Sequence, residues 1–227
     1  MKYEVILFDA DETLFDFKKS ERYAFTESFK QFNLPGDKEE CMKKYHEINT
    51  AIWKEFEKGT ITSTELKVER FNRLFREIGV NNDPKEFSEA YMYHLSNASF
   101  IYDESFKVLE YLKDKYRLAI ITNGLIDVQQ KRIRESKISH YFEAIVLSDE
   151  LKIAKPNAEI FNYTFSKMGI NNKNKVLMVG DSLSSDIKGG INAEIDTCWI
   201  NADNKVKPND MNITYEITDI LMLKDIL

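Results

Sequence analysis

The sequence predicts an α/β fold: a mostly parallel sheet with helices on both faces, and an all-helical domain inserted after the first strand. The apolar run Val5–Phe8 has the length and the β-branched content of a buried strand. From residue 102 onward, short apolar runs alternate with amphipathic segments, a pattern typical of parallel sheets. Residues 16–101 carry helical periodicity only. We therefore expect a core of residues 1–15 and 102–227, with residues 16–101 as a separate helical domain.

The composition argues against several classes of partner. The chain has 227 residues and a net charge of −6, and no run of Lys or Arg forms a basic stripe, which argues against a nucleic-acid polymer. Cys41 and Cys198 match no metal or redox spacing. We expect no signal peptide, because Met1-Lys2-Tyr3-Glu4 leads directly into the expected first strand, and no apolar run approaches the roughly 20 residues that a membrane span needs. We expect a cytoplasmic protein without membrane contact, either a monomer or a small homo-oligomer.

About four helices are expected in the inserted region. Apolar residues at helical spacing predict one helix around Phe25–Phe32 and a second around Tyr45–Phe56. The stretch Thr62-Ser63-Thr64-Glu65 is a capping-box pattern that opens a third helix, for which Gly79 is a stop signal. Pro84 begins a fourth helix.

The second part of the chain alternates between strands and helices. The expected strands cover residues 117–121, 144–147, 176–179 and 197–200, with 215–217 as an edge strand, and the expected helices cover residues 104–115, 127–136, 157–168, 184–192 and 220–227.

Polar residues follow the buried strands, and the carboxyl ends of parallel strands share one edge of a sheet. They are Asp9, Asp11, Thr122, Asn123, Lys155, Asp181 and Asp186. Successive strand residues point to opposite sides, so we expect the carboxylates of Asp9 and Asp11 on the same side and Ala10 facing away. Crowded carboxylates need more positive charge than one Lys supplies, which indicates a divalent cation. Mg²⁺ bridges to substrate phosphates, so the set predicts phosphoryl transfer to or from a small phosphorylated metabolite.

Each of these residues has an ordinary structural explanation when it is taken alone. An Asp after a strand is commonly a turn or helix N-cap residue, and an isolated Lys is commonly solvated. Their joint occurrence, in order and each near a strand end, favours a functional site. The aromatic residues of the inserted region and the isolated His46, His94 and His140 are expected to serve packing or to lie at the surface.

The ordered motifs resemble those of the haloacid dehalogenase-like (HAD) hydrolase superfamily, in the branch with a helical cap after strand one. Its first motif, D-x-D-x-[TV], matches Asp9-Ala10-Asp11-Glu12-Thr13, and its second, a strand ending in Ser or Thr, matches Ile120-Ile121-Thr122. Its third, a Lys before a helix, matches Ala154-Lys155-Pro156, and its fourth, G-D-x-x-x-x-D, matches residues 180–186. The resemblance covers nearly the whole chain and implies a Rossmann-like core (the HAD fold) with a cap domain.

The resemblance also implies roles in catalysis and metal binding. Asp9 would be the nucleophile that becomes an aspartyl phosphate, and Asp11 the general acid and then the general base. Asp9, the main-chain carbonyl of Asp11 and Asp181 would hold Mg²⁺, with Asp186 near the metal.

The remaining implied roles concern the phosphate. Thr122 and the backbone amide of Asn123 would bind phosphoryl oxygens. Lys155, oriented by Asp186, would neutralise charge on the nucleophile and on the phosphate. The implied activity is Mg²⁺-dependent hydrolysis of phosphomonoesters.

Departures from the family pattern bear on the substrate. Many phosphatases of this branch have Gly at the position of Glu12, and the Asp-Glu-Thr variant is typical of a subset that resembles the noncanonical pyrimidine 5′-nucleotidases. Residues 49–62 and 197–201 resemble the same group. Glu194 stands where the family usually has Gly, which implies a strained or shifted turn. We therefore expect pyrimidine nucleoside 5′-monophosphates as substrates, with a sugar phosphate or phosphoglycolate as the alternative.

Three other functions fit the motifs less well. Haloacid dehalogenases lack the second Asp of the first motif, so Asp11 disfavours dehalogenation. A phosphomutase would share both Asp9 and Asp11 and would be distinguished by its isomerised product. A non-catalytic phosphate-responsive module of the receiver type would carry its phosphoacceptor on a middle strand and have no large insertion after the first strand.

Overall fold

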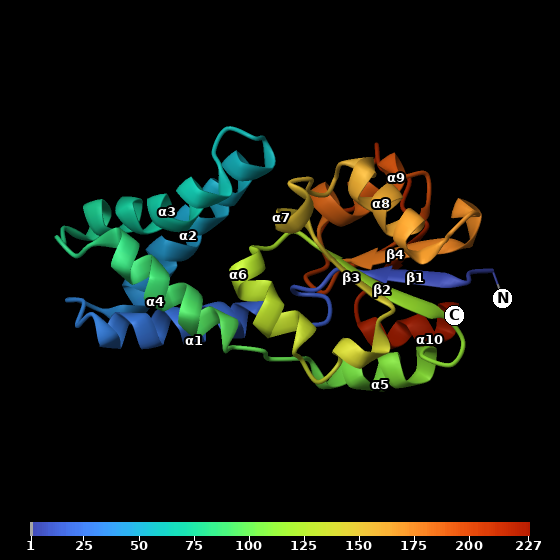
Figure 1. Cartoon of the computed structure of the whole chain (residues 1–227), viewed down its shortest axis with the longest axis horizontal. Coiled ribbons are helices and arrows are strands. Elements are labelled where there is room, and N and C mark those ends of the chain that lie inside the picture. Colours follow the sequence, from blue (N-terminus) through green and yellow to red (C-terminus); the bar gives the residue numbers. More distant parts are fainter. Residues whose placement is uncertain (1) are drawn as a thin grey trace.

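A parallel sheet of six strands forms the centre of one part of the molecule, and a group of helices lies beside it (Figure 1). The structure is a computed structural model that describes residues 2–227, apart from the side chain of residue 57. The strands are β1 (Val5–Phe8), β2 (Arg117–Thr122), β3 (Ala144–Leu147), β4 (Val176–Gly180), β5 (Asp196–Ile200) and β6 (Tyr215–Ile217). Their order in the sheet is β3-β2-β1-β4-β5-β6, so the direction of strand addition reverses at β1.

Helices follow the strands as alternation predicts. They are α1 (Phe17–Gln31), α2 (Lys38–Glu57), α3 (Ser63–Ile78), α4 (Pro84–Ser96), α5 (Asp103–Leu112), α6 (Ile126–Gln129), η1 (Gln130–Arg134), η2 (Ser139–Tyr141), α7 (Ser148–Leu151), α8 (Ala158–Met168), η3 (Lys173–Lys175), η4 (Leu183–Ile187), α9 (Lys188–Asn192), η5 (Ile220–Met222) and α10 (Leu223–Ile226). The predicted α/β class with a parallel sheet and a helical region is confirmed.

Successive residues of each strand point to opposite sides of the sheet, and helices cover both sides, so both faces are buried. Ile6 and Phe8 belong to one apolar cluster, whereas Val5 and Leu7 belong to another. Figure 1 shows α5 and α10 on one side of the sheet and α8 and α9 on the other. The strands are thus held rigidly, and the loops at their carboxyl ends receive fixed positions.

The helices α1–α4 have an aromatic core of their own. The ring of Tyr45 stacks between Phe25 and Phe71, with centroid distances of 5.1 and 5.3 Å. These aromatic residues therefore serve packing, as expected. Thr62 and Glu65 form the predicted capping box, and Gly79 ends α3 at a φ of 71°.

The two connections between the helical group and the sheet run side by side. Phe15 and Ile101 form an isolated antiparallel bridge, and the amide of Asp16 donates to the carbonyl of Phe100 at 3.0 Å. The chain therefore leaves the sheet region and returns to it at one place.

Two predicted helices are less regular than expected. The segment 127–136 becomes the short α6 followed by the π-helical turn η1, and the segment 184–192 becomes the π-helical turn η4 followed by α9. Glu194 adopts a left-handed φ of 62°, which is the conformation that Gly would take more easily. Both π-helical turns lie near the carboxyl edge of the sheet, and such turns are frequent at functional sites.

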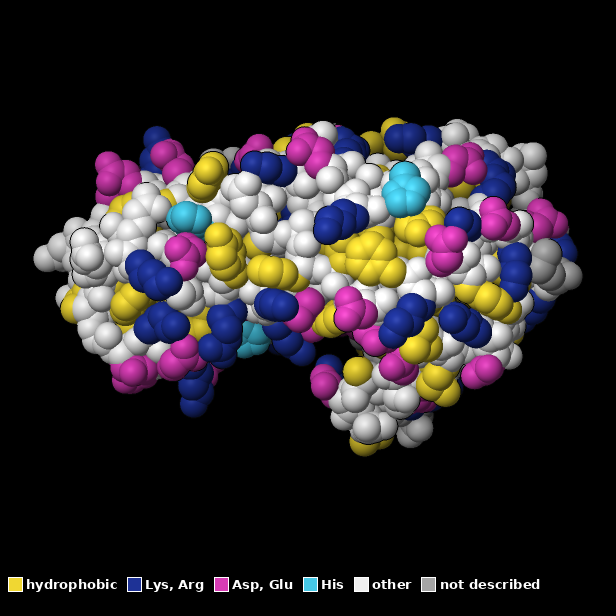
Figure 2. All heavy atoms as spheres, turned by 90° about the horizontal axis from the view of Figure 1, so that it is seen from below, with side chains coloured by type: hydrophobic (Ala, Val, Ile, Leu, Met, Phe, Trp, Pro, Cys, Tyr) yellow, Lys and Arg dark blue, Asp and Glu magenta, His cyan; other side chains and the backbone are white. Residues whose placement is uncertain are grey.

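The surface carries mixed charge. Figure 2 shows Lys and Arg side chains interspersed with Asp and Glu over one face, without a continuous basic stripe on that face. Among residues 2–227, no helix combines the length and the apolar character that crossing a membrane requires.

Candidate active site

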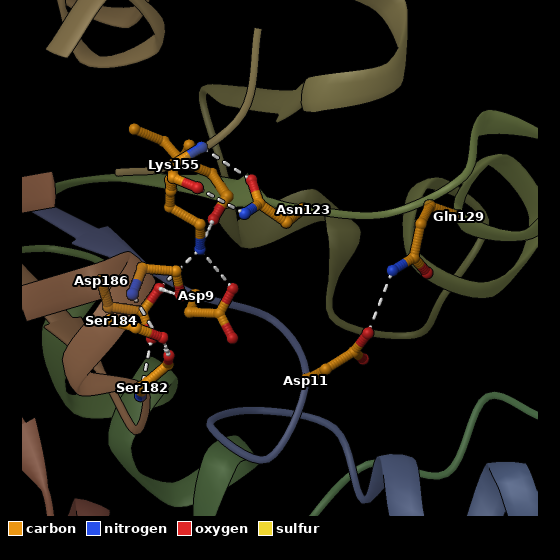
Figure 3. A network of polar contacts seen from close by, with 10 residues as sticks. Asp9, Asp11, Asn123, Gln129, Lys155, Ser182, Ser184 and Asp186 are labelled. Atoms are coloured by element: carbon orange, nitrogen blue, oxygen red, sulfur yellow. Dashed lines mark hydrogen bonds and ion pairs between the residues drawn. The ribbon is translucent and has the colours of Figure 1, made fainter. Parts of the chain in front are cut away.

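Lys155 lies at the centre of the polar cluster at the carboxyl edge of the sheet (Figure 3). Its Nζ is 2.5 Å from Oδ1 of Asp9, 2.7 Å from Oδ1 of Asp186 and 2.7 Å from the carbonyl oxygen of Ile121. The Lys155 side chain is 1% exposed and Asp186 is fully buried. Three residues that are far apart in the sequence therefore meet through one buried ammonium group.

The charge on Lys155 is stabilised by its neighbours. Burial lowers the pKa of an ammonium group, but the carboxylates of Asp186 and Asp9 outweigh this and hold the pKa of Lys155 above its ordinary value. Lys155 is therefore a permanent cation next to Asp9.

Three carboxylates converge at this edge. Asp9, Asp181 and Asp186 each offer an oxygen, and these oxygens lie within 4.8 Å of one another. Burial, followed by the charges of Asp186 and Glu12, raises the pKa of Asp181 to about 7. Burial also raises the pKa of Asp9, with Lys155 acting in the opposite direction. Hard oxygen donors with too little positive charge around them are what Mg²⁺ binds, so the residues present fit the predicted ion.

The fourth motif is shaped by close contacts. A Cβ atom at position 180 would lie 2.3 Å from Oδ2 of Asp186, so only Gly lets Asp186 reach Lys155. The amide of Ser182 donates to Oδ2 of Asp186 at 3.0 Å, and the indole of Trp199 donates to the carbonyl of Asp181 at 2.9 Å. The loop after β4 is thereby fixed with both carboxylates facing the centre.

Thr122 is the last residue of β2 and Asn123 follows it, close to the strand end that the sequence predicts. Thr122 is 1% exposed and lines the same cavity as Asp9. The side chain of Asn123 forms two hydrogen bonds that the sequence does not predict. Its Oδ1 accepts from the amide of Lys155 and its Nδ2 donates to the carbonyl of Lys155, both at 2.8 Å. The two bonds fix the backbone of Lys155 against the end of β2.

Asp11 points away from Asp9 in Figure 3. Its Oδ2 accepts from Gln129 at 3.1 Å, and its Oδ1 forms an ion pair with the fully buried Arg132. β1 ends at Phe8 and Glu12 takes a left-handed φ of 59°, so the strand alternation expected for Asp9 and Asp11 does not extend to Asp11. The carboxylate of Asp11 lies outside the cluster of Asp9, Asp181 and Asp186.

Glu12 stabilises the start of the helical region. Its Oε1 accepts from the amide of Lys18 at 2.8 Å, and its Oε2 is 3.3 Å from Nζ of Lys18. The hydroxyl of Tyr102, on the returning connection, lies 3.4 Å from Oε2. Glu12 therefore joins the motif loop to both chain connections.

A cavity of about 390 Å³ extends from the carboxylate cluster to the helices α1–α4. All predicted site residues except Asp186 line it, and Asp186 lies behind Lys155. The helical wall contributes polar residues that were not predicted, namely Glu21, His46, Asn49 and Arg70. His46, expected to be structural or at the surface, thus borders the cavity. Figure 2 shows a notch between the helical part and the sheet part of the molecule.

Comparison with known proteins identifies the family. Residues 3–194 match the family model of the haloacid dehalogenase-like hydrolases. The chain belongs to this family, as its motifs indicated, and it is a hydrolytic enzyme. It is 33% identical over its whole length to the pyrimidine 5′-nucleotidase YjjG of Escherichia coli (strain K12), of which it covers 99%, and 33% identical to the pyrimidine 5′-nucleotidase PynA of Streptococcus pneumoniae, of which it covers 96%.

A solved structure shares the whole fold. The crystal structure of the HAD-hydrolase YfnB from Bacillus subtilis, described as bound to magnesium and as revealing interdomain movement, has a TM-score of 0.93 at 34% identity. The alignment covers 100% of this chain and 99% of that one. The helical region and the sheet therefore have the same arrangement in both proteins.

Proposed function

We propose that this protein is a Mg²⁺-dependent phosphomonoesterase that acts through an aspartyl phosphate on pyrimidine nucleoside 5′-monophosphates. The observation that carries the proposal is the position of Lys155 Nζ between Asp9 and Asp186, beside the three converging carboxylates. A carboxylate can attack an anionic phosphate only where cations offset both charges. Lys155 supplies one cation against Asp9, and the three carboxylates beside it would bind a second.

The domain division belongs to the proposal. Residues 1–15 and 102–227 would form the catalytic core, and residues 16–101 a cap domain. The paired connections at Phe15 and Ile101 support this division, because two chain segments that cross side by side at one place allow the cap to move as a unit.

Asp9, the main-chain carbonyl of Asp11 and Asp181 would hold Mg²⁺, with Asp186 nearby. The ion would stabilise the charge on the phosphoryl oxygens, which Thr122, the amide of Asn123 and Lys155 would also contact.

Asp9 and Asp11 divide the chemistry. A carboxylate oxygen of Asp9 attacks phosphorus, the ester P–O bond breaks, and Asp11 gives a proton to the departing oxygen. Asp11 then takes a proton from water, the water oxygen attacks phosphorus, and the bond from phosphorus to Asp9 breaks. Free phosphate leaves and both carboxyl groups return to their first state.

The substrate proposal rests on the relatives and on the cavity. YjjG and PynA are named as pyrimidine 5′-nucleotidases, and both align with this chain along its whole length. The cavity has the size of a site for a small ligand, and residues of both the helical region and the sheet region line it. Cytoplasmic location, absence of membrane contact and a monomeric or small homo-oligomeric state stay predictions.

A phosphate-release screen tests the proposal. We expect pyrimidine monophosphates such as UMP and dTMP to give kcat/KM values at least tenfold above those of AMP, ribose 5-phosphate and phosphoglycolate, and EDTA to abolish release. A strong sugar-phosphate signal beside a flat nucleotide response would reject the nucleotidase assignment but keep the phosphatase. Conversion of the substrate to an isomeric ester without free phosphate would indicate a phosphomutase.

A further inference from the structure

The helical wall of the cavity carries three polar residues that hydrogen bonds connect. Oε1 of Glu21 (α1) accepts from Nδ2 of Asn49 (α2) at 2.9 Å, and Oδ1 of Asn49 lies 3.4 Å from Nη1 of Arg70 (α3). Glu21, Asn49 and Arg70 are 2%, 5% and 2% exposed, and all three line the cavity. Glu21 thus fixes the carboxamide of Asn49 in one orientation, and Asn49 in turn contacts Arg70.

Arg70 is a buried cation with weak partners. Among residues 2–227, with the side chain of residue 57 excepted, it forms no ion pair with a carboxylate. Its Nη1 also faces the hydroxyl of Tyr45 at 3.4 Å, its Nε faces the carbonyl of Lys67 at 3.3 Å, and its Nη2 faces Sδ of Met92 at 3.2 Å. The guanidinium lies over the ring of Tyr91 at 4.8 Å, which holds its plane in place. Burial of a charged group with neutral and distant partners is costly, so a strong acceptor in the cavity would relieve it.

The surroundings favour a neutral acceptor over a second anion. The buried carboxylate of Glu21 contacts His46 at 3.1 Å and reaches Arg70 only through Asn49, so it offsets part of the charge of Arg70 without pairing with it. Apolar side chains of Phe17, Trp53 and Leu125 line the same cavity. A flat ring with a carbonyl oxygen satisfies both features, because the ring packs on the apolar side chains while its oxygen accepts from the guanidinium.

We propose that Arg70, oriented through Asn49 and Glu21, binds a ring carbonyl oxygen of the pyrimidine base and so selects the leaving group. The inference rests on the proposed nucleotidase function and goes beyond it by assigning the base to a specific subsite. Adenine has no ring carbonyl, so the subsite disfavours adenine nucleotides, because a buried donor would stay without an acceptor.

Arg70→Met tests the subsite, because it removes the donors and keeps much of the apolar stem. We expect kcat/KM for UMP to fall about tenfold to a hundredfold, mainly through KM, while kcat/KM for p-nitrophenyl phosphate stays within about twofold. Arg73→Met on the same helix is the matched control, since Arg73 pairs with Glu55 outside the cavity lining and should leave both substrates unaffected. Equal losses on UMP and p-nitrophenyl phosphate, or no loss on UMP, would overturn the inference while leaving the phosphatase intact.

A binding measurement on the wild-type protein is independent of the folding of any variant. Uridine should inhibit p-nitrophenyl phosphate hydrolysis competitively, with an inhibition constant at least tenfold below that of adenosine. Adenosine binding as tightly as uridine would reject a carbonyl subsite even if UMP were hydrolysed. Hydrolysis of p-nitrophenyl phosphate without any hydrolysis of UMP would instead reject the nucleotidase function and, with it, the subsite.

Discussion

Arg132 holds the carboxylate of Asp11 in an ion pair, although the two residues are 121 positions apart in the chain. The guanidinium also donates to Oε1 of Gln129 at 2.8 Å, and Gln129 donates to the second oxygen of Asp11. Arg132 further lies over the rings of Phe15 and Phe17, and its carbonyl accepts from Ser99 at 2.7 Å. The proposed acid and base is therefore tied to a residue that contacts both connections to the helical region.

Arg132→Lys is expected to impair proton transfer to poor leaving groups. Lys keeps the charge but lacks the planar fork that contacts Asp11 and Gln129 together, so Asp11 would be less well oriented. We expect kcat/KM for a nucleoside monophosphate to fall about tenfold, with a smaller loss for p-nitrophenyl phosphate, whose leaving group needs no proton. Steady-state kinetics on both substrates provide the measurement.

Arg134→Lys is the matched control for Arg132→Lys. Arg134 lies two residues further on and pairs with Glu150 away from Asp11. Arg134→Lys should leave kcat/KM unchanged for both the nucleoside monophosphate and p-nitrophenyl phosphate. If Arg132→Lys lowered both kcat/KM values by the same factor, Arg132 would serve the structure generally rather than the placement of Asp11.

Asp9→Asn is expected to abolish turnover and leave the fold intact. The amide cannot attack phosphorus, so phosphate release should fall by at least about a thousandfold. The substitution also removes one of three crowded carboxylates, so Tm in EDTA should stay equal or rise. Phosphate release and thermal unfolding check the two halves of the prediction; turnover close to wild type would reject Asp9 as the nucleophile.

Strand positions and motif spacing were enough to predict the sheet and the candidate residues that meet at its carboxyl edge. Asp9 and Asp181 follow β1 and β4, and Thr122 ends β2, and these neighbouring parallel strands bring the three residues to one edge. The position of Lys155 was predicted by its motif, and its burial against Asp9 and Asp186 follows from the need to pair those charges.

The contacts of Asp11 with Gln129 and Arg132 could not be predicted from the sequence. Gln129 and Arg132 lie in a segment that has the pattern of an ordinary amphipathic helix, and its π-helical turn leaves no local mark in the sequence. The direction of Asp11 depends on the turn after Phe8 and on long-range packing. The sequence carries only a weak indication of the polar residues in the helical wall. Arg70 is a charged residue directly next to the core residue Phe71, on the buried side of α3.

Lys155→Met is expected to destabilise the protein strongly. It leaves Asp9 and Asp186 buried without their cation, and breaking a buried pair typically costs about 3–5 kcal/mol. Urea unfolding in EDTA should show this loss, and phosphate release should disappear with it. Lys152→Met is the control, since the Lys152 side chain is 72% exposed and its pair with Asp149 should contribute less than about 1 kcal/mol. Equal stability of the two variants would contradict the central role of Lys155.

Mg²⁺ is expected to stabilise the protein more at pH 8 than at pH 5.5. The pKa of Asp181 is raised from 3.8 to about 7 in the folded protein. The folded protein therefore binds this proton more tightly than the unfolded chain does. Protonation of Asp181 stabilises the fold fully below about pH 4, and this contribution is lost as the pH rises through about 7. Mg²⁺ binds the deprotonated carboxylates, so its stabilisation grows over the same range. At about 100 times its Kd, an ion adds about 2.7 kcal/mol, which corresponds to roughly 5–10 °C in Tm at pH 8.

Thermal unfolding with Mg²⁺ or EDTA at the two pH values measures this difference in stabilisation by the ion. At pH 5.5 the Mg²⁺-dependent shift in Tm should be less than half of that at pH 8, because protons compete for Asp181. Asp181→Asn should remove most of the shift at both pH values, since the neutral amide is a poorer ligand for a hard cation. A shift at pH 5.5 as large as that at pH 8, or one that Asp181→Asn leaves unchanged, would place the ion away from the cluster of Asp9, Asp181 and Asp186.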